Sequence, residues 1–475
     1  MIELSENISS YIEKHFGKGY LKSYAEYFND EYKSFVRISP TVSSEKIISN
    51  LRMYGIELEA VAGITNAFKV IQDKNIVGKT LDFILGSYYI QSLSSMIPAI
   101  VLNPNENDVV LDLCAAPGSK TTQLAEMMNN KGTLIANEIA LDRARILLFN
   151  TEKQSLVNTG VINSKGELLG KHFNDYFDKI LVDAPCSALG ITQKKGEVSN
   201  WWNTKKAEGL SEIQYRLLVS AIKMCKVGGE IVYSTCTLTL EENELVLDKI
   251  LDKYPVELVD INLPVKSKPA FTKYADEELN PQISKAHRIV PWEVSSEGFF
   301  VSRLKKVSDT EKTEKIKHQE NLYRIVSYEN KGIKTYLDKL ADYYGTGKSI
   351  LEKYKYIDRK GDIYIVDADW KCSEINQFMR VGLKLGTIDK RETIQLNSFA
   401  VKLFSNLLTK NIVELKERNE LEVYLKGGTI KKDFGSYGQK VIKYNDYFVG
   451  TAVSSKEGLK SQFPRTFRTQ EIVLI

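Results

Sequence analysis

The sequence predicts an α/β protein whose central domain is a doubly wound parallel sheet flanked by helices. From Asp108 onward, short apolar runs alternate with longer amphipathic segments, a pattern typical of βαβ units. The length of 475 residues exceeds what one ordinary core can organise and predicts about two to four domains. A hydrophobic content of 43% and a charged content of 27% are those of a globular chain. We therefore expect further domains on both sides of the central one.

Five strands are expected in series in the central domain, each a run of mostly apolar residues. They span 109–113, 133–138, 160–163, 179–183 and 230–235. Helices are expected between them at about 121–128, 141–153 and 211–225. Ser211 and Gln214 form a capping box for the last helix, and Gly228-Gly229 would end it. Thr239 and Glu242 repeat that box before another amphipathic run, which predicts one more helix.

The flanking regions show other patterns. The first ~100 residues carry amphipathic helical segments followed by mixed structure, so a mostly helical extension is expected. Between 305 and 320 the only aliphatic residues beyond the charged run are Val307 and Ile316, which predicts a linker or an exposed helix. From Asn321 onward, tyrosine-rich strand-like runs separated by glycine turns predict a β-rich or α+β module.

The cysteines and the N-terminus indicate an intracellular chain, and we expect it in the cytoplasm. Five scattered cysteines without C-x-x-C spacing argue against a disulfide framework or a zinc site. No apolar run approaches the roughly 18 residues that could cross a bilayer, and the N-terminus lacks the pattern of a secretory signal. A net charge of +4 permits nucleic-acid binding through a local patch without requiring it. We expect no metal and no membrane partner.

The stretch "VVLDLCAAPGSKTTQLAEMM" predicts a strand, a turn of small residues and a helix that together bind a ligand. Ala115, Ala116 and Gly118 let the backbone approach a ligand closely, and the helix after them offers unpaired amides. Glu138 ends the next strand, where a carboxylate can accept hydrogen bonds from a ribose. Neither G-x-G-x-x-G nor the P-loop G-K-[ST] is present, so S-adenosylmethionine suits the turn better than a dinucleotide or a triphosphate. The alternative is a turn that serves packing alone, with Glu138 solvated.

Two cysteines follow directly after predicted strands. Cys186 comes after 179–183 and Cys236 after 230–235, and carboxyl ends of parallel strands meet at one edge of a sheet. Cys114 and Cys225 fit better as small buried hydrophobic residues. A thiolate that adds to carbon 6 of a pyrimidine makes carbon 5 nucleophilic toward a sulfonium methyl group. Asp183 could stabilise the ring at nitrogen 3. The residues alone leave open which cysteine attacks.

Six motifs resemble those of the Nol/Nop/Sun family of RNA cytosine-5 methyltransferases, which depend on S-adenosylmethionine. They occur in the family's order across about 86–303: "YYIQSLSSM", "VLDLCAAPGSKT", "NEIALDRARIL", "ILVDAPCS", "GGEIVYSTCTLTLEENE" and "EGFFVSRL". The resemblance implies a Rossmann-like methyltransferase core. It also implies that Cys236 is the nucleophile and that Cys186 assists release of the product.

The resemblance implies roles for further residues when it is carried over position by position. The residues that would hold the methionine part of the cofactor are Cys114, Ala115, Ala116, Pro117, Gly118, Ser119 and Lys120. Glu138 would hold the ribose, Asp183 would face both cofactor and base, Lys120 would also reach the active site, and Arg143 would support the pocket. Asn163 stands where the family commonly has an acidic residue that contacts adenine, and "PCSALG" replaces the usual Pro-Cys-Ser-Gly.

The tail resembles, more loosely, the RNA-binding region of the family's bacterial ribosomal members and ends in a segment similar to a PUA-type module. The stretches are "RVGLKLG", "YLKGG" and "LKSQFPRTFR", and Lys460, Arg465 and Arg468 are candidate phosphate contacts. The expected domains are an RNA-binding extension (1–95), the methyltransferase domain (96–306), a linker (307–320), an intermediate domain (321–395) and a PUA-like RNA-binding domain (396–475). We expect a monomeric enzyme that acts on 16S ribosomal RNA or the 30S subunit. A transfer RNA methyltransferase and a non-catalytic ribosome-assembly factor are the alternatives.

Overall fold

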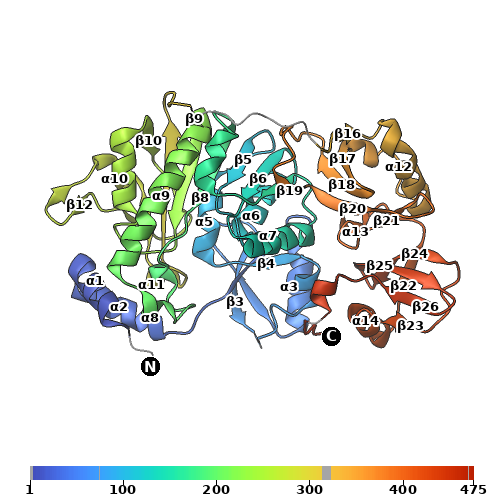
Figure 1. The fold of residues 1–475 in the computed structure, drawn as a ribbon. Helices are drawn as coiled ribbons and strands as arrows, with labels where there is room; N and C mark the ends of the chain where they lie inside the picture. The colour runs from blue at the N-terminus through green and yellow to red at the C-terminus, as the bar shows by residue number, and fades with distance from the viewer. Residues whose placement is uncertain (1–3, 74, 313–321, 469, 475) are drawn as a thin grey trace.

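A ten-stranded sheet forms the centre of the molecule (Figure 1). The computed structural model describes residues 4–73, 75–312, 322–468 and 470–474. The five strands expected from the sequence are present and parallel, in the spatial order β7-β6-β5-β8-β9. Their bounds are β5 (Val109–Asp112), β6 (Thr133–Asn137), β7 (Thr159–Ile162), β8 (Phe177–Asp183) and β9 (Cys225–Thr235). The order reverses between β5 and β8, which is where a doubly wound sheet binds its ligand.

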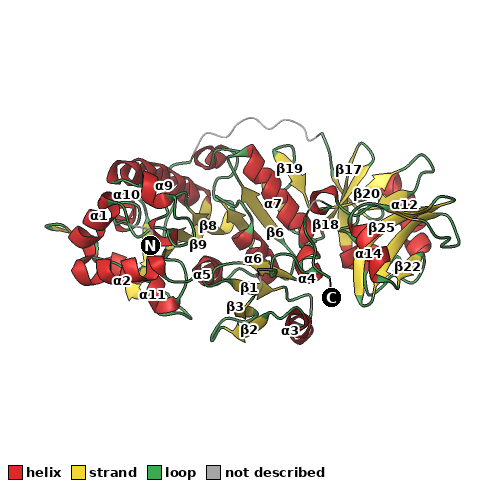
Figure 2. Cartoon of the chain, turned by 90° about the horizontal axis from the view of Figure 1, so that it is seen from below, coloured by secondary structure: helices red, strands yellow, loops and turns green. Residues whose placement is uncertain are grey.

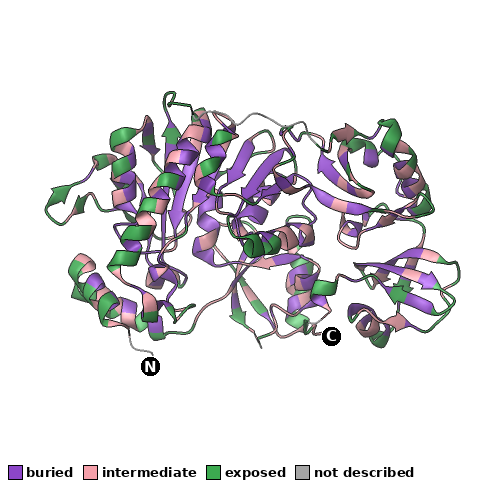
Figure 3. Ribbon diagram, in the orientation of Figure 1, coloured by how far each residue is buried: buried purple, intermediate pink, exposed green. Residues whose placement is uncertain are grey.

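Antiparallel strands extend this sheet beyond β9, and helices cover both of its faces. The added strands are β15 (Phe299–Lys306), β14 (His287–Ile289), β11 (Lys268–Pro269) and β10 (Val256–Val259). The covering helices are α5 (Leu93–Leu102), α6 (Ser119–Met127), α7 (Leu141–Lys153), α9 (Thr204–Met224) and α10 (Glu244–Lys253). Because side chains alternate along a strand, Val110 packs with α5 and α6, whereas Leu111 packs with α9 and α10. Most of the central strands are therefore buried on both faces (Figure 3).

The boundaries of two helices differ from the prediction. Helix α9 begins at Thr204 rather than near 211, because the side chain of Asn203 caps it by accepting a hydrogen bond from the Lys206 amide at 3.0 Å. The helix ends at Met224, and Gly228 and Gly229 lie inside β9. The second capping box is also wrong: Thr239 bonds the Glu242 carboxylate, and α10 begins at Glu244.

The N-terminal region forms two separate parts. Helices α1 (Glu6–Phe16) and α2 (Lys18–Asn29) lie against α8 (Val198–Trp201) and α11 (Pro291–Val294) at one end of the molecule (Figures 1 and 2). The mixed structure that follows is a four-stranded sheet in the order β2-β3-β1-β4 with helices α3 and α4. Its elements are β1 (Phe35–Ile38), α3 (Ser44–Met53), β2 (Glu57–Ala60), β3 (Ala67–Gln72), α4 (Leu81–Ile84) and β4 (Tyr88–Ile90).

Two five-stranded sheets make up most of the C-terminal region, in the orders β16-β17-β18-β20-β21 and β22-β24-β25-β26-β23. The first comprises β16 (Ile325–Ser327), β17 (Tyr354–Arg359), β18 (Asp362–Asp367), β20 (Leu383–Ile388) and β21 (Ile394–Leu396), with α12 (Lys331–Tyr344). The second comprises β22 (Ile412–Leu415), β23 (Thr429–Ile430), β24 (Gly438–Tyr444), β25 (Tyr447–Ser455) and β26 (Gly458–Ser461), with α13 (Val401–Phe404) and α14 (Arg418–Leu425). These are the α+β modules expected of the tail.

One strand of the tail joins the central sheet, which the sequence did not predict. β19 (Phe378–Val381) pairs antiparallel with β7. Gly160 in β7 allows this contact, because a Cβ there would lie 2.6 Å from the Phe378 ring. The region expected as an intermediate domain is thus attached directly to the central sheet. The expected linker at 307–320 falls partly on 313–321, which lie outside the described residues. No helix in the described part of the chain is long and apolar enough to cross a membrane.

Candidate active site

A cavity of about 410 Å³ opens at the carboxyl ends of the parallel strands, next to the point where their order reverses. Its volume falls within the range of ligand pockets. Three central strand ends contribute to it: Asp112 ends β5, Asp183 ends β8, and Cys236 follows β9. The other lining residues that the sequence singled out are Cys114, Ala115, Ala116, Pro117, Ser119 and Lys120. The structure therefore brings the predicted turn, the carboxyl group and one of the two cysteines to a single site.

The second cysteine lies directly beside the first. Cys186 Sγ and Cys236 Sγ are 3.1 Å apart, and both thiols are free. They meet because β8 and β9 are adjacent, with Asp183 opposite Ser234 in the register. The hydrogen bond to Cys236 and burial both raise the pKa of Cys186 well above its usual value. The raised pKa favours the protonated form of Cys186, and either sulfur can be the donor in this hydrogen bond.

Asp183 is held by a buried lysine and a serine. Lys120 Nζ donates to Asp183 Oδ2 at 2.7 Å and to Ser95 Oγ at 2.9 Å, and Ser234 Oγ donates to Asp183 Oδ1 at 2.9 Å. Burial opposes the charge on Lys120, but the charge of Asp183 and the hydrogen bond to it outweigh burial and raise the lysine pKa. The pair is thus a fixed ionic group at the wall of the cavity.

The turn after β5 forms a cradle with an unsatisfied oxygen at its base. Gly118 adopts φ 111°, a left-handed conformation that favours glycine, and Arg143 donates to the Ala116 carbonyl at 2.6 Å. Asp112 receives Thr121 Oγ1 on Oδ2 at 2.7 Å, whereas its buried Oδ1 has no partner among the described residues. Burial raises the pKa of Asp112 to about 7. A buried polar oxygen facing small residues fits a ligand that carries its own hydrogen-bond donors.

Glu138, Arg143 and Asn163 lie behind this cradle and do not line the cavity. The Glu138 carboxylate is buried, accepts the Ala140 amide at 3.0 Å and lies 3.5 Å from Arg143. Asn163 donates to the carbonyl oxygens of Glu138 and Ile139 at 2.7 and 2.9 Å. Their predicted contacts with ribose and adenine stay predictions.

The sequence missed Glu242 as a residue that positions both cysteine loops. This buried carboxylate accepts the Ser187 amide at 2.8 Å and Gln214 Nε2 and Thr239 Oγ1 at 2.9 and 2.7 Å. It also accepts a hydrogen bond from the Ser187 hydroxyl. Glu242 therefore ties the segment after Cys186 to the segment after Cys236. Its signal in the sequence, a polar run after an apolar strand, was interpreted as a helix cap.

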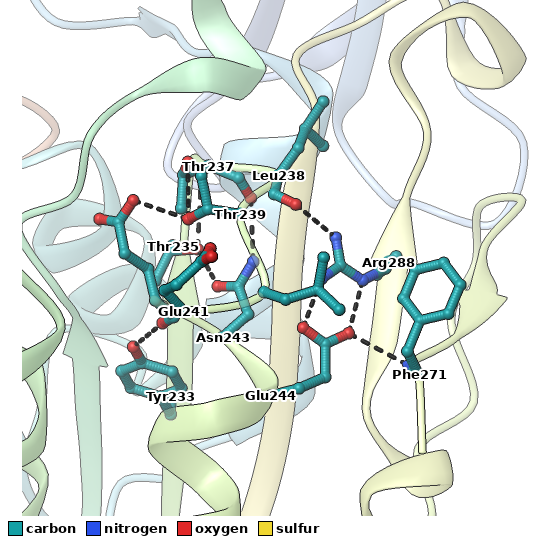
Figure 4. Close-up of polar contacts among 12 residues, drawn as sticks. Tyr233, Thr235, Thr237, Leu238, Thr239, Glu241, Asn243, Glu244, Phe271 and Arg288 are labelled. Atoms are coloured by element: carbon teal, nitrogen blue, oxygen red, sulfur yellow. Dashed lines mark hydrogen bonds and ion pairs between the residues drawn. The ribbon is translucent and has the colours of Figure 1, made fainter. Parts of the chain in front are cut away.

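A second buried network anchors the loop that follows Cys236 (Figure 4). Arg288 donates to both carboxylate oxygens of Glu244 and, at 2.8 Å, to the Leu238 carbonyl. Asn243 accepts a bond from Thr235 Oγ1 at 2.6 Å and donates to the Thr237 carbonyl at 3.2 Å. The loop from 236 to 243 is fixed on both sides, so the position of the Cys236 sulfur is set by the fold.

The N-terminal helices complete this wall of the site. Tyr11 OH donates to Glu241 at 2.6 Å, Tyr24 OH to the Leu189 carbonyl at 2.7 Å, and Tyr27 OH to the Ser296 carbonyl at 2.9 Å. These contacts link α1 and α2 to the loops after β8 and β9 and to the segment between α11 and β15. The N-terminal helices thus support the catalytic domain as well as extending it.

Comparisons with known proteins agree with this geometry. A family model described as "16S rRNA methyltransferase RsmB/F" matches residues 99–305. The chain is 29% identical over 468 residues to Ribosomal RNA small subunit methyltransferase F of Shewanella piezotolerans, covering 94% of this chain and 93% of that one. It is 35% identical over 272 residues to tRNA (cytosine(49)-C(5))-methyltransferase of Pyrococcus abyssi, covering 57% of this chain and 87% of that one.

Solved structures show the same likeness in three dimensions. A methyltransferase homologue from Pyrococcus horikoshii matches with a TM-score of 0.56 and 29% identity, covering 62% of this chain and 93% of that one. The structure titled "NSun6 from Pyrococcus horikoshii with SFG" shares the fold, with a TM-score of 0.57 and 24% identity over 64% of this chain and 98% of that one. The chain belongs to the Nol/Nop/Sun family of S-adenosylmethionine-dependent RNA cytosine-5 methyltransferases.

Proposed function

We propose that this enzyme methylates carbon 5 of a cytosine in small-subunit (16S) ribosomal RNA. One observation carries the choice of substrate: the match to ribosomal RNA small subunit methyltransferase F runs through 94% of the chain and so includes the C-terminal sheets. The match to the tRNA methyltransferase covers only 57% of the chain. The C-terminal region is therefore shared with the ribosomal enzymes.

In this proposal the thiolate of Cys236 adds to carbon 6 of the target cytosine. The new sulfur–carbon bond pushes an electron pair toward carbon 5, which becomes nucleophilic. Once carbon 5 is methylated, a base removes its remaining proton. The electron pair of that carbon–hydrogen bond re-forms the double bond between carbons 5 and 6, and the sulfur–carbon bond breaks and returns its electron pair to Cys236. Cys186, 3.1 Å away and protonated, donates a hydrogen bond to the departing thiolate and speeds its release.

While Cys236 is attached, the Asp183 carboxylate would stabilise the ring by accepting a hydrogen bond from nitrogen 3 once that nitrogen is protonated, and Lys120 orients the carboxylate. Asp183 would face the nitrogen-3 edge of the ring, and its carboxylate is oriented by Lys120 and Ser234. Lys120 also fixes the wall of the cavity through Ser95. Because Asp183 and Lys120 are already held in place, little energy is needed to reorient these charged groups during the reaction.

S-adenosylmethionine would supply the methyl group when it is bound in the cradle. We propose that the turn of 114–120 holds its methionine part and that the unsatisfied Oδ1 of Asp112 accepts a hydrogen bond from it. Glu138, Arg143 and Asn163 would serve its nucleoside part, as the family resemblance implies.

We further propose that the regions around the methyltransferase domain bind RNA and that the enzyme works as a cytoplasmic monomer. The division is 1–95, 96–306, 307–320, 321–395 and 396–475, with a PUA-like module at the end. Lys460 and Arg465 are exposed, as phosphate contacts require. Arg468 is partly engaged inside the module, because its Nε donates to the Phe463 carbonyl at 2.8 Å.

Transfer of a labelled methyl group tests this proposal. Purified enzyme and labelled S-adenosylmethionine are incubated with 16S ribosomal RNA, 30S particles and transfer RNA, each lacking the modification, and Cys236→Ala serves as the inactive control. We expect label in ribosomal RNA or 30S particles. Label in transfer RNA alone would make this a tRNA enzyme, and no label in any of the three would favour the assembly-factor alternative.

A further inference from the structure

A second cavity, of about 150 Å³, lies where three regions of the chain meet, away from the active site. The N-terminal sheet region contributes Ile84, Leu85 and Ser87, and the end of α7 contributes Lys153. The C-terminal region contributes most of the remaining wall, including Phe399, Lys402, Tyr447 and Phe467. A cavity of this volume holds a benzene-sized molecule, so a phosphate group fits.

Lys153 brings an ammonium group into this cavity without an anionic partner. The residue is 6% exposed. Its Nζ lies 3.4 Å from the centre of the Phe83 ring and 5.9 Å from that of Phe467. An aromatic face attracts a cation but offers no hydrogen-bond acceptor comparable to a carboxylate. Burial, followed by the nearby charge of Lys402, lowers the pKa of Lys153 to about 7.

Lys402 lines the same cavity from the C-terminal side. Its Nζ donates to the Gly86 carbonyl at 3.2 Å, and burial lowers its pKa to about 8. Gly86 also packs against Lys153, since a Cβ on Gly86 would lie 3.2 Å from Lys153 Cγ. The two lysines therefore flank one backbone segment, and their charges repel each other.

No carboxylate neutralises these lysines among the described residues. Neither Lys153 nor Lys402 forms an ion pair there. The one acidic residue that lines the cavity, Asp446, is 75% exposed and lies 3.1 Å from Lys46. Lys153 is buried and Lys402 is half-buried, and two such ammonium groups without an anion are costly in a folded protein. A bound anion would remove that cost.

We propose that this cavity is a binding site for a phosphate group, held between the ammonium groups of Lys153 and Lys402. Ser87 and Ser155 lie in the same wall, where Ser155 Oγ donates to the Phe399 carbonyl at 2.9 Å. The phosphate group either belongs to the RNA backbone or is a free phosphate ion. In both cases it ties the N-terminal sheet region, the methyltransferase domain and the C-terminal region together at their junction.

Thermal unfolding of the full chain in inorganic phosphate tests the site. The measurement is made at about pH 6, below the pKa values of both lysines, against sodium chloride of equal ionic strength. We expect phosphate to raise the Tm of the wild type by about 2 °C or more. The Tm of Lys153→Met should not rise in phosphate. In sodium chloride its Tm should be higher than that of the wild type, because the substitution removes an unpaired buried charge. No specific rise in the wild type, or an equal rise in Lys153→Met, would overturn the proposal.

Lys331→Met is the matched control, because Lys331 is exposed and forms no ion pair among the described residues. It should keep the full response to phosphate, whereas Lys402→Met should lose it. If the pocket variants fail to fold, equilibrium dialysis of the wild type with radiolabelled phosphate tests whether the site binds phosphate. Saturable binding of one phosphate at about pH 6 that disappears above about pH 9 supports the site, and no such binding contradicts it.

Binding of a single-stranded RNA oligonucleotide separates the two sources of the phosphate group. Each lost backbone contact lowers the slope of log affinity against log salt concentration by about 0.7. If the slope for Lys402→Met is lower by that amount, and inorganic phosphate competes with the oligonucleotide for the wild type, the site binds the RNA backbone. An unchanged slope together with a lost Tm response assigns it to free phosphate. The Tm experiment does not depend on methyl transfer, so its result is independent of the proposed substrate.

Discussion

The active-site cavity and the junction cavity each contain a buried lysine, and the two lysines are in opposite electrostatic states. Lys120 lies 2.7 Å from Asp183, and its pKa is raised. Among the residues that the structure describes, Lys153 faces aromatic rings and a second lysine but no carboxylate, and its pKa is lowered to about 7. Both residues are less than 10% exposed, so the presence of a carboxylate, rather than burial, makes the difference.

This difference shows how the same residue type serves two tasks. In the active site the anion is built into the chain, so the ionic pair is complete before any substrate arrives. At the junction the chain supplies only the cations, and the anion has to come from a ligand. We therefore expect substitution of the two lysines to change the stability of the protein in opposite directions.

The largest effect is expected from Asp183→Asn in the active site. The substitution removes the charge that acts on the cytosine ring and leaves Lys120 without its partner, as Lys153 is now. Methyl transfer should fall by about 10²- to 10³-fold. The assay is labelled methyl incorporation at saturating RNA, with the exposed Glu257→Gln as control. Activity within a few-fold of the wild type would remove Asp183 from the mechanism.

The next effect is on stability, where the two lysines should respond in opposite directions. Lys120→Met leaves Asp183 unpaired and should lower the free energy of unfolding by about 2 kcal/mol, which is less than for a fully buried pair because the Asp183 side chain is 26% exposed. Lys153→Met should raise the free energy of unfolding in phosphate-free buffer. Urea denaturation measures both, and changes of the same sign would break the comparison.

The smallest effect is the pH dependence of stability. Between about pH 7 and pH 10.5 the unfolded chain keeps a proton on Lys153 that the folded chain has lost, so the free energy of unfolding should rise with pH. Lys402 contributes in the same direction above about pH 8. The folded chain raises the pKa of Lys120, so the stabilisation that this lysine adds to the free energy of unfolding is fully present below pH 10.5 and is lost only above it. Lys153→Met should lose the part of the rise near pH 7, and an identical pH profile in this variant would show that Lys153 is charged in the folded chain.

The central strands and the meeting of Cys186 with Cys236 could be predicted from the sequence. Both depend on local patterns and on one general property of parallel sheets, that carboxyl strand ends share an edge. The start of α9 could not be predicted, because Asn203 competes with Ser211 as a cap and only packing selects between them. Gln214, expected in a capping box, instead bonds the buried Glu242.

Features that depend on distant segments escaped prediction. Strand β19 joins the sheet beside β7 although more than 200 residues separate them. Glu244 begins helix α10, whereas its partner Arg288 lies in strand β14, and the junction cavity is assembled from three regions. Glu138 was expected to end its strand but follows directly after it, and its carboxylate contacts Ala140 and Arg143 rather than the cavity. A sequence pattern shows where a side chain lies along an element but not which remote side chain it meets.

Covalent trapping on RNA tests the central claim most directly, namely that Cys236 attacks and Cys186 assists release. The wild type, Cys186→Ala and Cys236→Ala are incubated with S-adenosylmethionine and the RNA that accepts label, and the products are separated on a denaturing gel. We expect Cys186→Ala to accumulate a protein–RNA adduct and Cys236→Ala to form none. An adduct in Cys236→Ala and none in Cys186→Ala would reverse the two roles and contradict the account.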